Sequence, residues 1–127
     1  MSRLIPILNT IQKRNNLNVL YAVGEKGPGN AYHEYEVLMV PGSEEENATA
    51  ERIVFQKGPR KDPESQRGVL DTDLLEIVRH RLTCFQTSDF ATRENEMALQ
   101  HIEEALLWMN KRVEDRFERG VLGTYEK

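Results

Sequence analysis

The stretch DTDLLEIVRHRLTCFQTSDFATRENEMALQHIEEALLWMNKRVEDRFERG, residues 71–120, decides the fold. It contains no proline, and its only glycine is Gly120. Apolar side chains recur in it at helical spacing, which predicts one helix over residues 71–86 and another over residues 92–118. Asp71 or Thr72 can cap the first helix, and Gly120 is suited to the C-terminal cap of the second. The short connection between the helices makes them an antiparallel hairpin.

The preceding residues have the opposite character, because turn-forming residues interrupt them repeatedly. Loops are predicted where Gly, Pro, Ser and Asn cluster, at residues 24–30, 41–47 and 57–68. Between the loops, alternating side chains predict short strands over residues 17–23, 31–40 and 53–56. Strands followed by helices indicate an α+β fold, with a small N-terminal antiparallel β-sheet and a C-terminal antiparallel two-helix hairpin.

The start of the chain is ambiguous, because Pro6 interrupts an apolar run within residues 1–16. A strand or a short helix is expected there. The length of 127 residues predicts a single domain. Its parts are a β-rich segment, a basic loop, the hairpin and a tail, at residues 1–56, 57–70, 71–120 and 121–127.

Composition excludes several classes of protein. Hydrophobic residues make up 39% of the chain, too many for a disordered protein, and no apolar run is long enough to cross a membrane. We find no signal peptide and expect a cytoplasmic protein that does not bind membranes. The net charge of −4 argues against binding to a nucleic acid polymer.

No residue pattern predicts an enzyme active site. His80 and Cys84 are four residues apart on one helix and could form a nucleophilic pair, but we expect a small buried thiol beside a surface histidine, because free cysteines are usually buried and inert. Glu34 and Glu36 share a strand face and could act as acid and base, or could line a solvated edge. The histidines show no metal-ligand spacing, so neither a metal nor another cofactor is expected.

Two clusters of cations are candidates for binding anions. The loop at 57–68 carries Lys57, Arg60 and Lys61, which could present cations to phosphates or could form an ordinary solvated loop. Near the end of the second helix, Arg112 and Arg116 share a face with Arg119. Cations there complement the helix dipole, but arginine also suits stacking on a base and forked contacts to phosphate.

Nearby residues offer further candidate contacts. Asp115 could accept hydrogen bonds from a ligand or pair with an arginine. Phe85 could belong to the core or stack on a base. Asn95 stands in the first turn of the second helix, where the default role is capping.

Three motifs carry a resemblance to a known family. They are F-A-x-R-E-N at 90–95, L-x-W-M/L-N-x-R at 106–112 and D-R-x-x-R-G-V at 115–121. With the surrounding sequence, from 55 to 124, they are similar to the helical hairpin shared by two groups of phage immune-evasion proteins. One is the anti-Thoeris sponge that sequesters glycosyl cyclic ADP-ribose, and the other is the anti-CBASS sponge that sequesters cyclic oligonucleotides. The β-rich first half is similar to the anti-Thoeris group.

The resemblance implies a binding protein that holds a cyclic nucleotide signal without degrading it, in the cytoplasm of an infected bacterium. It implies that Phe85 and Arg112 sandwich the adenine, with hydrogen bonds from Asn95 and Asp115. Arg116 joins this candidate set because it shares a helix face with Arg112. The resemblance also favours a second anion site for cyclic oligonucleotides, at Lys57, Arg60 and Lys61.

Helix lengths predict that the site is shared between copies of the chain. Arg112 follows Asn95 by 17 residues in the same predicted helix, which is roughly 25 Å. One small dinucleotide cannot touch both ends of one hairpin, but it can if two copies pack antiparallel. The second helix also overshoots the first, leaving Val113 and Phe117 without cover. A homodimer or a higher homo-oligomer, such as a hexamer, is therefore expected.

Two other function classes remain open at this point. One is an enzyme that degrades the same signal, and the other is a structural or regulatory phage protein built on the hairpin. The first lacks a visible nucleophile, and the second leaves the arginines unexplained.

Overall fold

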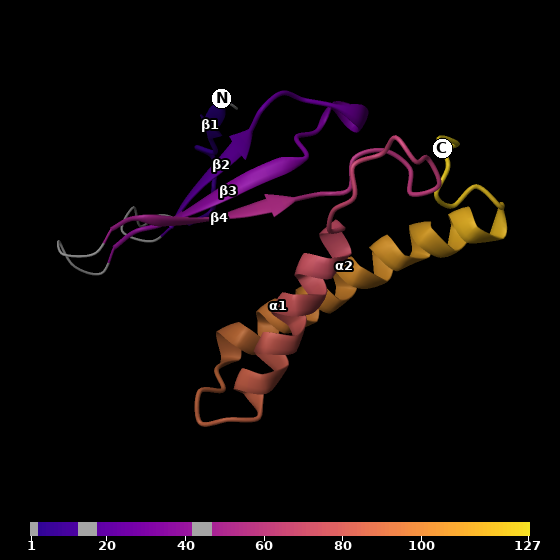
Figure 1. Cartoon of the computed structure of the whole chain (residues 1–127). Coiled ribbons are helices and arrows are strands. Elements are labelled where there is room, and N and C mark those ends of the chain that lie inside the picture. The colour runs from indigo at the N-terminus through magenta and orange to yellow at the C-terminus, as the bar shows by residue number, and fades with distance from the viewer. Residues whose placement is uncertain (1–2, 13–17, 42–46) are drawn as a thin grey trace. The chain divides into compact units, whose positions relative to one another are not determined.

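The computed structural model describes residues 3–12, 18–41 and 47–127. The elements in chain order are β1 (Leu4–Pro6), β2 (Val19–Val23), the 3-10 turn η1 (Pro28–Asn30), β3 (Glu34–Met39), β4 (Thr49–Val54), α1 (Asp71–Gln86) and α2 (Arg93–Glu118) (Figure 1). They fall into two compact units. The first comprises residues 1–58 and 64–68, and the second comprises residues 59–63 and 69–127. The predicted α+β fold, strands first and a helical pair afterwards, is confirmed.

The first unit is a four-stranded antiparallel meander in the order β1-β2-β3-β4. Pro6 ends β1 at the edge of the sheet, where its missing N–H removes no ladder hydrogen bond from an interior strand. The ambiguous start of the chain therefore contains a strand. Of the apolar side chains in the described residues, those of Ala22 and Val23 are buried, and both belong to β2.

The central strands were predicted at the right places but are shorter than expected. β2 covers residues 19–23 of the predicted 17–23, and Leu17 lies outside the described residues. β3 covers residues 34–39 of the predicted 31–40. The predicted shared face of Glu34 and Glu36 is confirmed, because both carboxylates contact Arg52, which opposes Glu36 on β4.

The fourth strand corrects the prediction over residues 53–56. β4 runs from Thr49 to Val54, and it pairs residue by residue with β3 from Met39 back to Glu34. Its first four residues, TAER, are exposed and show no apolar alternation, so the sequence pattern missed them. Arg52 instead joins the strand to its neighbour, because its guanidinium contacts Glu34 at 3.1 Å and Glu36 at 3.0 Å. Cross-strand ion pairs of this kind support a polar sheet face.

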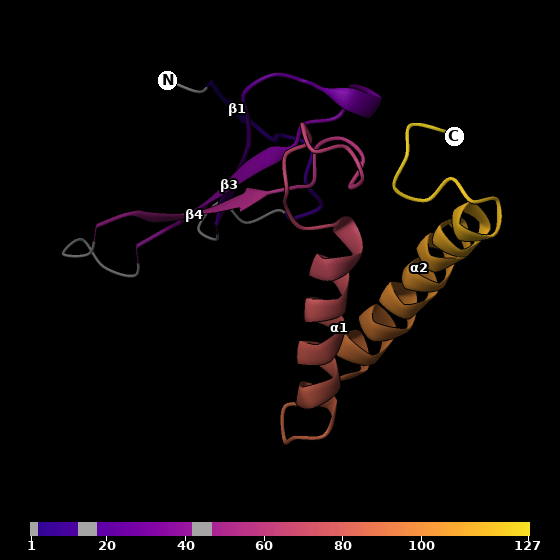
Figure 2. The same ribbon diagram turned by 45° about the vertical axis from the view of Figure 1, so that its right-hand side comes forward.

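The second unit is built on the helical hairpin, and both predicted helices are confirmed. α1 matches residues 71–86, and α2 begins one residue after the expected Thr92 and ends at the expected Glu118. Their axes spread apart away from the turn that joins them (Figure 2). α2 is the longer element, with 26 residues against 16, so its C-terminal part extends beyond the length that α1 can cover.

The predicted cap of α1 was wrong. Leu70, not Asp71 or Thr72, occupies the N-cap position with an extended backbone. Its N–H donates to a carboxylate oxygen of Asp73 at 2.8 Å, so the capping acceptor comes from inside the first turn. At the C-terminal end of α2, Arg119 is the C-cap and Gly120 follows it. Gly120 has a φ of 72°, a conformation that glycine adopts without strain.

Candidate functional site

The turn end of the hairpin is held by side-chain hydrogen bonds between its two helices. The Gln86 amide donates to the Thr92 carbonyl at 3.0 Å, and the Thr92 N–H donates back to the Gln86 side-chain oxygen at 3.1 Å. The Thr92 hydroxyl in turn accepts the Asn95 N–H at 3.0 Å, which makes Thr92 the N-cap of α2. The end of α1 and the start of α2 are therefore fixed relative to each other.

Phe85 and Asn95 lie on this fixed end. The Phe85 side chain is 38% exposed, so its ring is available at the surface. Arg81, one helical turn earlier, places its guanidinium carbon 5.5 Å from the centre of that ring. Thr92 performs the capping that the sequence left to Asn95, and the half-buried Asn95 side chain has no hydrogen bond within the described residues. An exposed ring and an open amide thus occur together.

Arg112 and Asp115 lie on the C-terminal half of α2. Arg112 is exposed, and its side chain contacts no hydrogen-bond or ion-pair partner among the described residues. Asp115 accepts from Nε of Arg119 at 3.1 Å, an exposed pair one turn apart, and so it pairs with Arg119 rather than Arg112. Ion pairs at such exposure are weak, so a ligand can compete for this carboxylate.

Arg116 differs from its two neighbouring arginines, because it is 8% exposed. Its guanidinium donates to the backbone carbonyls of Val121 and Thr124, at 3.1 and 3.2 Å, and to that of Glu126. These bonds fold residues 121–126 back onto the end of α2. Of the three arginines that the sequence placed on one face, Arg116 is the one that is buried and donates to backbone carbonyls.

A groove of about 690 Å³ lies between the diverging helices. Three of its lining residues come from α1 and five from α2: Thr72, Glu76, Arg79, Glu103, Leu106, Leu107, Asn110 and Val113. Arg79 spans it, donating from Nε to Glu103 at 2.9 Å. The groove is lined in part by Val113, one of the two apolar residues predicted to lie on the part of α2 that extends beyond α1.

The basic loop divides between the two units. Lys57 belongs to the first unit, where its backbone pairs with that of Gln66. Arg60 and Lys61 belong to the second, on a turn that the Asp62 N–H closes by donating to the Pro59 carbonyl at 3.1 Å. The side chains of Arg60 and Lys61 have no hydrogen-bond or ion-pair partner in the part of the chain that the structure describes.

The candidate catalytic groups lie on two elements, with Glu34 and Glu36 on β3 and His80 and Cys84 on α1. Glu34 and Glu36 are both paired with Arg52 on one sheet face. Cys84 is exposed, which corrects the expectation of a buried thiol. In the described residues, no group of three or more His, Cys, Asp and Glu side chains could hold a metal ion. Neither helix of these residues has an apolar stretch that could cross a bilayer.

The sequence reading missed two features of the hairpin. Arg81 stands four residues before Phe85, a spacing that puts both on one helix face and could have suggested the contact. The contact between Arg79 and Glu103 joins residues 24 apart, so local spacing gives no signal for it.

Comparisons with known proteins agree with the hairpin. The family model described as "Acb2/Tad1, hairpin domain" matches residues 47–114. That range includes Phe85, Asn95 and Arg112 and ends just before Asp115. "Thoeris anti-defense 1" of Bacillus phage SBSphiJ7 is 49% identical over 75 residues, which cover 59% of this chain and 52% of the relative. The match thus spans about half the length of that curated relative. Because the family model covers more than half of the chain, the protein belongs to the Acb2/Tad1 hairpin family.

Proposed function

We propose that this protein is a phage sponge that binds and sequesters, without cleaving, a nucleotide immune signal. The signal is glycosyl cyclic ADP-ribose of the Thoeris defence, and holding it prevents activation of the effector in the cytoplasm of the infected bacterium. A sponge lowers the concentration of free signal by mass action, so its function depends on affinity and copy number rather than on turnover. No cofactor is needed for this role.

The observation that carries the proposal is the fixed turn end of the hairpin. There the Phe85 ring is exposed and the Asn95 amide is open, while Gln86 and Thr92 hold the backbone on which both stand. A purine stacks on an aromatic face and is identified by hydrogen bonds along its edge. Because these groups are already in place, little ordering cost opposes binding.

The other half of the site is proposed to come from a second copy of the chain. Arg112 lies 17 positions after Asn95 within α2, about 25 Å along the helix. In an antiparallel homodimer, Phe85 and Asn95 of one copy meet Arg112 and Asp115 of the other, giving two equal sites. The fold supports a partner, because several large apolar side chains of α2 are strongly exposed: Leu107 71%, Trp108 65% and Phe117 68%.

A second ligand class is proposed for the basic loop. Arg60 and Lys61, which belong to the second unit, are exposed cations with no partner among the described residues. Such groups suit the several phosphates of a cyclic oligonucleotide.

Titration calorimetry tests the function directly. The purified chain is titrated with isomers of cyclic ADP-ribose and with cyclic di- and trinucleotides, and its mass is measured by light scattering in parallel. We expect tight binding of a cyclic ADP-ribose isomer, a mass of at least twice 14.7 kDa, and intact ligand after the complex is denatured. Altered ligand would indicate an enzyme, and binding of no signal would indicate a structural hairpin protein. A monomer that binds tightly would exclude the shared site.

A further inference from the structure

The segment after α2 is attached at two places within the second unit. Arg116 holds the carbonyls of Val121, Thr124 and Glu126. A buried cation is costly unless its donors are satisfied, and here three carbonyls near the end of a helix satisfy them. This makes Arg116 the anchor of residues 121–126.

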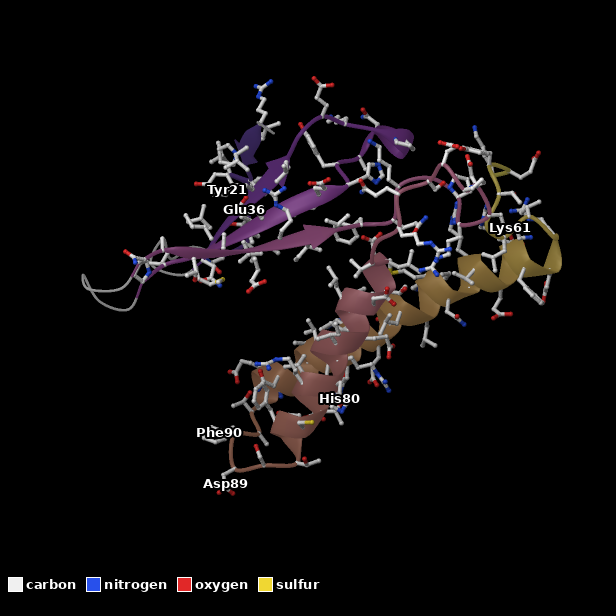
Figure 3. The ribbon with its side chains drawn as sticks, in the orientation of Figure 1. Tyr21, Glu36, Lys61, His80, Asp89 and Phe90 are labelled. Atoms are coloured by element: carbon white, nitrogen blue, oxygen red, sulfur yellow. The ribbon has the colours of Figure 1, made fainter. Side chains whose placement is uncertain are left out.

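The same segment holds the turn of residues 59–63. The Lys61 N–H donates to the Gly123 carbonyl at 3.3 Å, and the Tyr125 hydroxyl donates to the Asp62 carboxylate at 2.6 Å. Gly123 has a φ of 78°, and a Cβ added there would lie 3.3 Å from Cγ of Lys61. The Lys61 stem thus packs directly over this glycine. Figure 3 shows Lys61 beside the C-terminal segment.

The turn carries two open cations. Its backbone is held by the contacts just described, whereas the charged ends of Arg60 and Lys61 have no partner within the described residues. Cations on a fixed backbone lose less conformational freedom on binding an anion than cations on a loose loop. The arrangement therefore fits a preorganised contact for phosphate.

We infer that residues 121–126, anchored by Arg116, set the position of the Arg60–Lys61 turn, so that Arg116 is a positioning residue for the anion site rather than a ligand contact. The inference rests on the proposed second ligand class. It revises the role first considered for Arg116, since the donors that would reach a ligand are taken by backbone carbonyls. Lysine cannot reproduce the function, because three carbonyls spread over six residues need the two separated nitrogens of a guanidinium.

The rate of amide hydrogen exchange at Lys61 measures how firmly the turn is attached to residues 121–126. The affinities for two ligands measure whether this attachment matters for binding. The full chain is studied as wild type, Arg116→Gln, Arg116→Lys and Tyr125→Phe, with cyclic tri-adenylate and glycosyl cyclic ADP-ribose, called cyclic ADP-ribose below, as probes. Arg119→Gln is the matched control for exchange, because it removes the C-cap arginine of α2, whose side chain donates to Asp115 rather than to the carbonyls of the segment.

In Arg116→Gln we expect exchange at the Lys61 amide to rise about 10- to 100-fold, the scale of losing charge-assisted hydrogen bonds. Affinity for cyclic tri-adenylate should fall in parallel, while affinity for cyclic ADP-ribose stays nearly unchanged. Arg116→Lys should restore little of either loss. Tyr125→Phe, which removes a single exposed hydroxyl and leaves the helices untouched, should shift exchange and tri-adenylate affinity in the same direction by a smaller factor.

Three results would overturn the inference. One is unchanged exchange at Lys61 in both Arg116→Gln and Tyr125→Phe. Another is equal loss of both ligands without faster exchange, which would make Arg116 a ligand contact. The third is a wild-type protein that binds cyclic ADP-ribose but not cyclic tri-adenylate, which would leave the proposed function standing. Binding of neither ligand would refute the proposed function as well.

Discussion

Side chains of the candidate site divide into open and engaged groups. Asn95 and Arg112 have no hydrogen-bond partner among the described residues, whereas Asp115 pairs with Arg119 and Arg116 holds backbone carbonyls. An open polar group binds a ligand without first breaking an internal bond. This difference ranks the candidate residues by how readily they could contact a ligand, with Asn95 and Arg112 first, Asp115 next and Arg116 last.

Phe85→Ala tests the stacking face. We expect affinity for cyclic ADP-ribose to fall by about 1–3 kcal/mol, because base–aromatic stacking has that scale. The loss of stability should be smaller than for a core phenylalanine, since the ring is 38% exposed. Calorimetry and thermal melting separate the two effects. Phe90→Ala, at a ring 75% exposed in the connecting turn, is the control and should bind normally. Unchanged affinity in folded Phe85→Ala would refute stacking.

Arg112→Lys tests whether ligand binding needs the planar guanidinium of Arg112 or only its positive charge. Lysine keeps the positive charge but lacks the planar fork that can cover a purine and donate to phosphate or ribose. We expect most of the affinity to be lost, measured by calorimetry. The melting temperature should hardly change, because the exposed Arg112 side chain has no polar partner in the described residues. A lysine variant that binds as well as the wild type would reduce the role of Arg112 to charge alone.

The contact between Tyr125 and Asp62 predicts a pH effect. The hydrogen bond to Asp62 raises the pKa of Tyr125 above its usual 10.0, with smaller contributions from desolvation and the carboxylate charge. The folded state thus favours the neutral phenol. The contact contributes fully below pH 10 and is lost as the pH rises through the elevated pKa of Tyr125. In an ultraviolet phenolate titration, Asp62→Asn should lower that pKa, and a titration identical to the wild type would argue against the contact.

At the scale of elements, the helices could be predicted and the polar strand could not. α1 and α2 carry a continuous apolar period that no proline interrupts, so their bounds were found within one residue. β4 depends on pairing with β3 and on contacts between Arg52 and two glutamates, which a local pattern does not contain. The N-cap of α1 was mispredicted for a similar reason. The sequence pattern favours Asp71 or Thr72 as the cap, whereas Leu70 occupies the N-cap position and Asp73 supplies the acceptor for its N–H.

In the candidate site too, local spacing predicts some features, and contacts between distant residues determine the others. The positions of Phe85 and Arg112 on the two helices could be read from spacing. The engagement of Arg116 by residues 121–126 depends on a backbone that turns at Gly120 and Gly123, both with positive φ. Nothing in the local pattern of α2 distinguishes Arg116 from Arg119.

Thr92→Ala tests the element that carries Asn95. Loss of the hydroxyl that caps the Asn95 N–H should reduce stability by about 0.5–2 kcal/mol, measured by urea unfolding. Thr83→Ala is the matched control, because its hydroxyl donates to the Arg79 carbonyl inside α1, where alanine is well accepted. Equal stabilities for the two variants would show that the cap contributes nothing to the fixed turn end.

On the scale of the whole molecule, the second unit contains neither of the two apolar residues that are buried among the described residues. Those residues are Ala22 and Val23, both in the sheet. The hairpin keeps Ile77, Leu107, Trp108 and Phe117 more than half exposed. A small domain that buries little apolar surface by itself is stabilised by association. In the proposed antiparallel dimer, the same association would bring Phe85 of one copy to Arg112 of another.

A mixed dimer is the most direct measurement of this shared site. Phe85→Ala and Arg112→Ala chains are co-expressed with different tags, the heterodimer is purified, and its stoichiometry with cyclic ADP-ribose is determined by calorimetry. Each variant alone should bind poorly, because both of its sites lack one side of the sandwich. The heterodimer should recover one tight site, since one of its two interfaces keeps both native residues. A confirmed heterodimer with no tight site would contradict the account and place Phe85 and Arg112 in one chain's pocket or outside the pocket altogether.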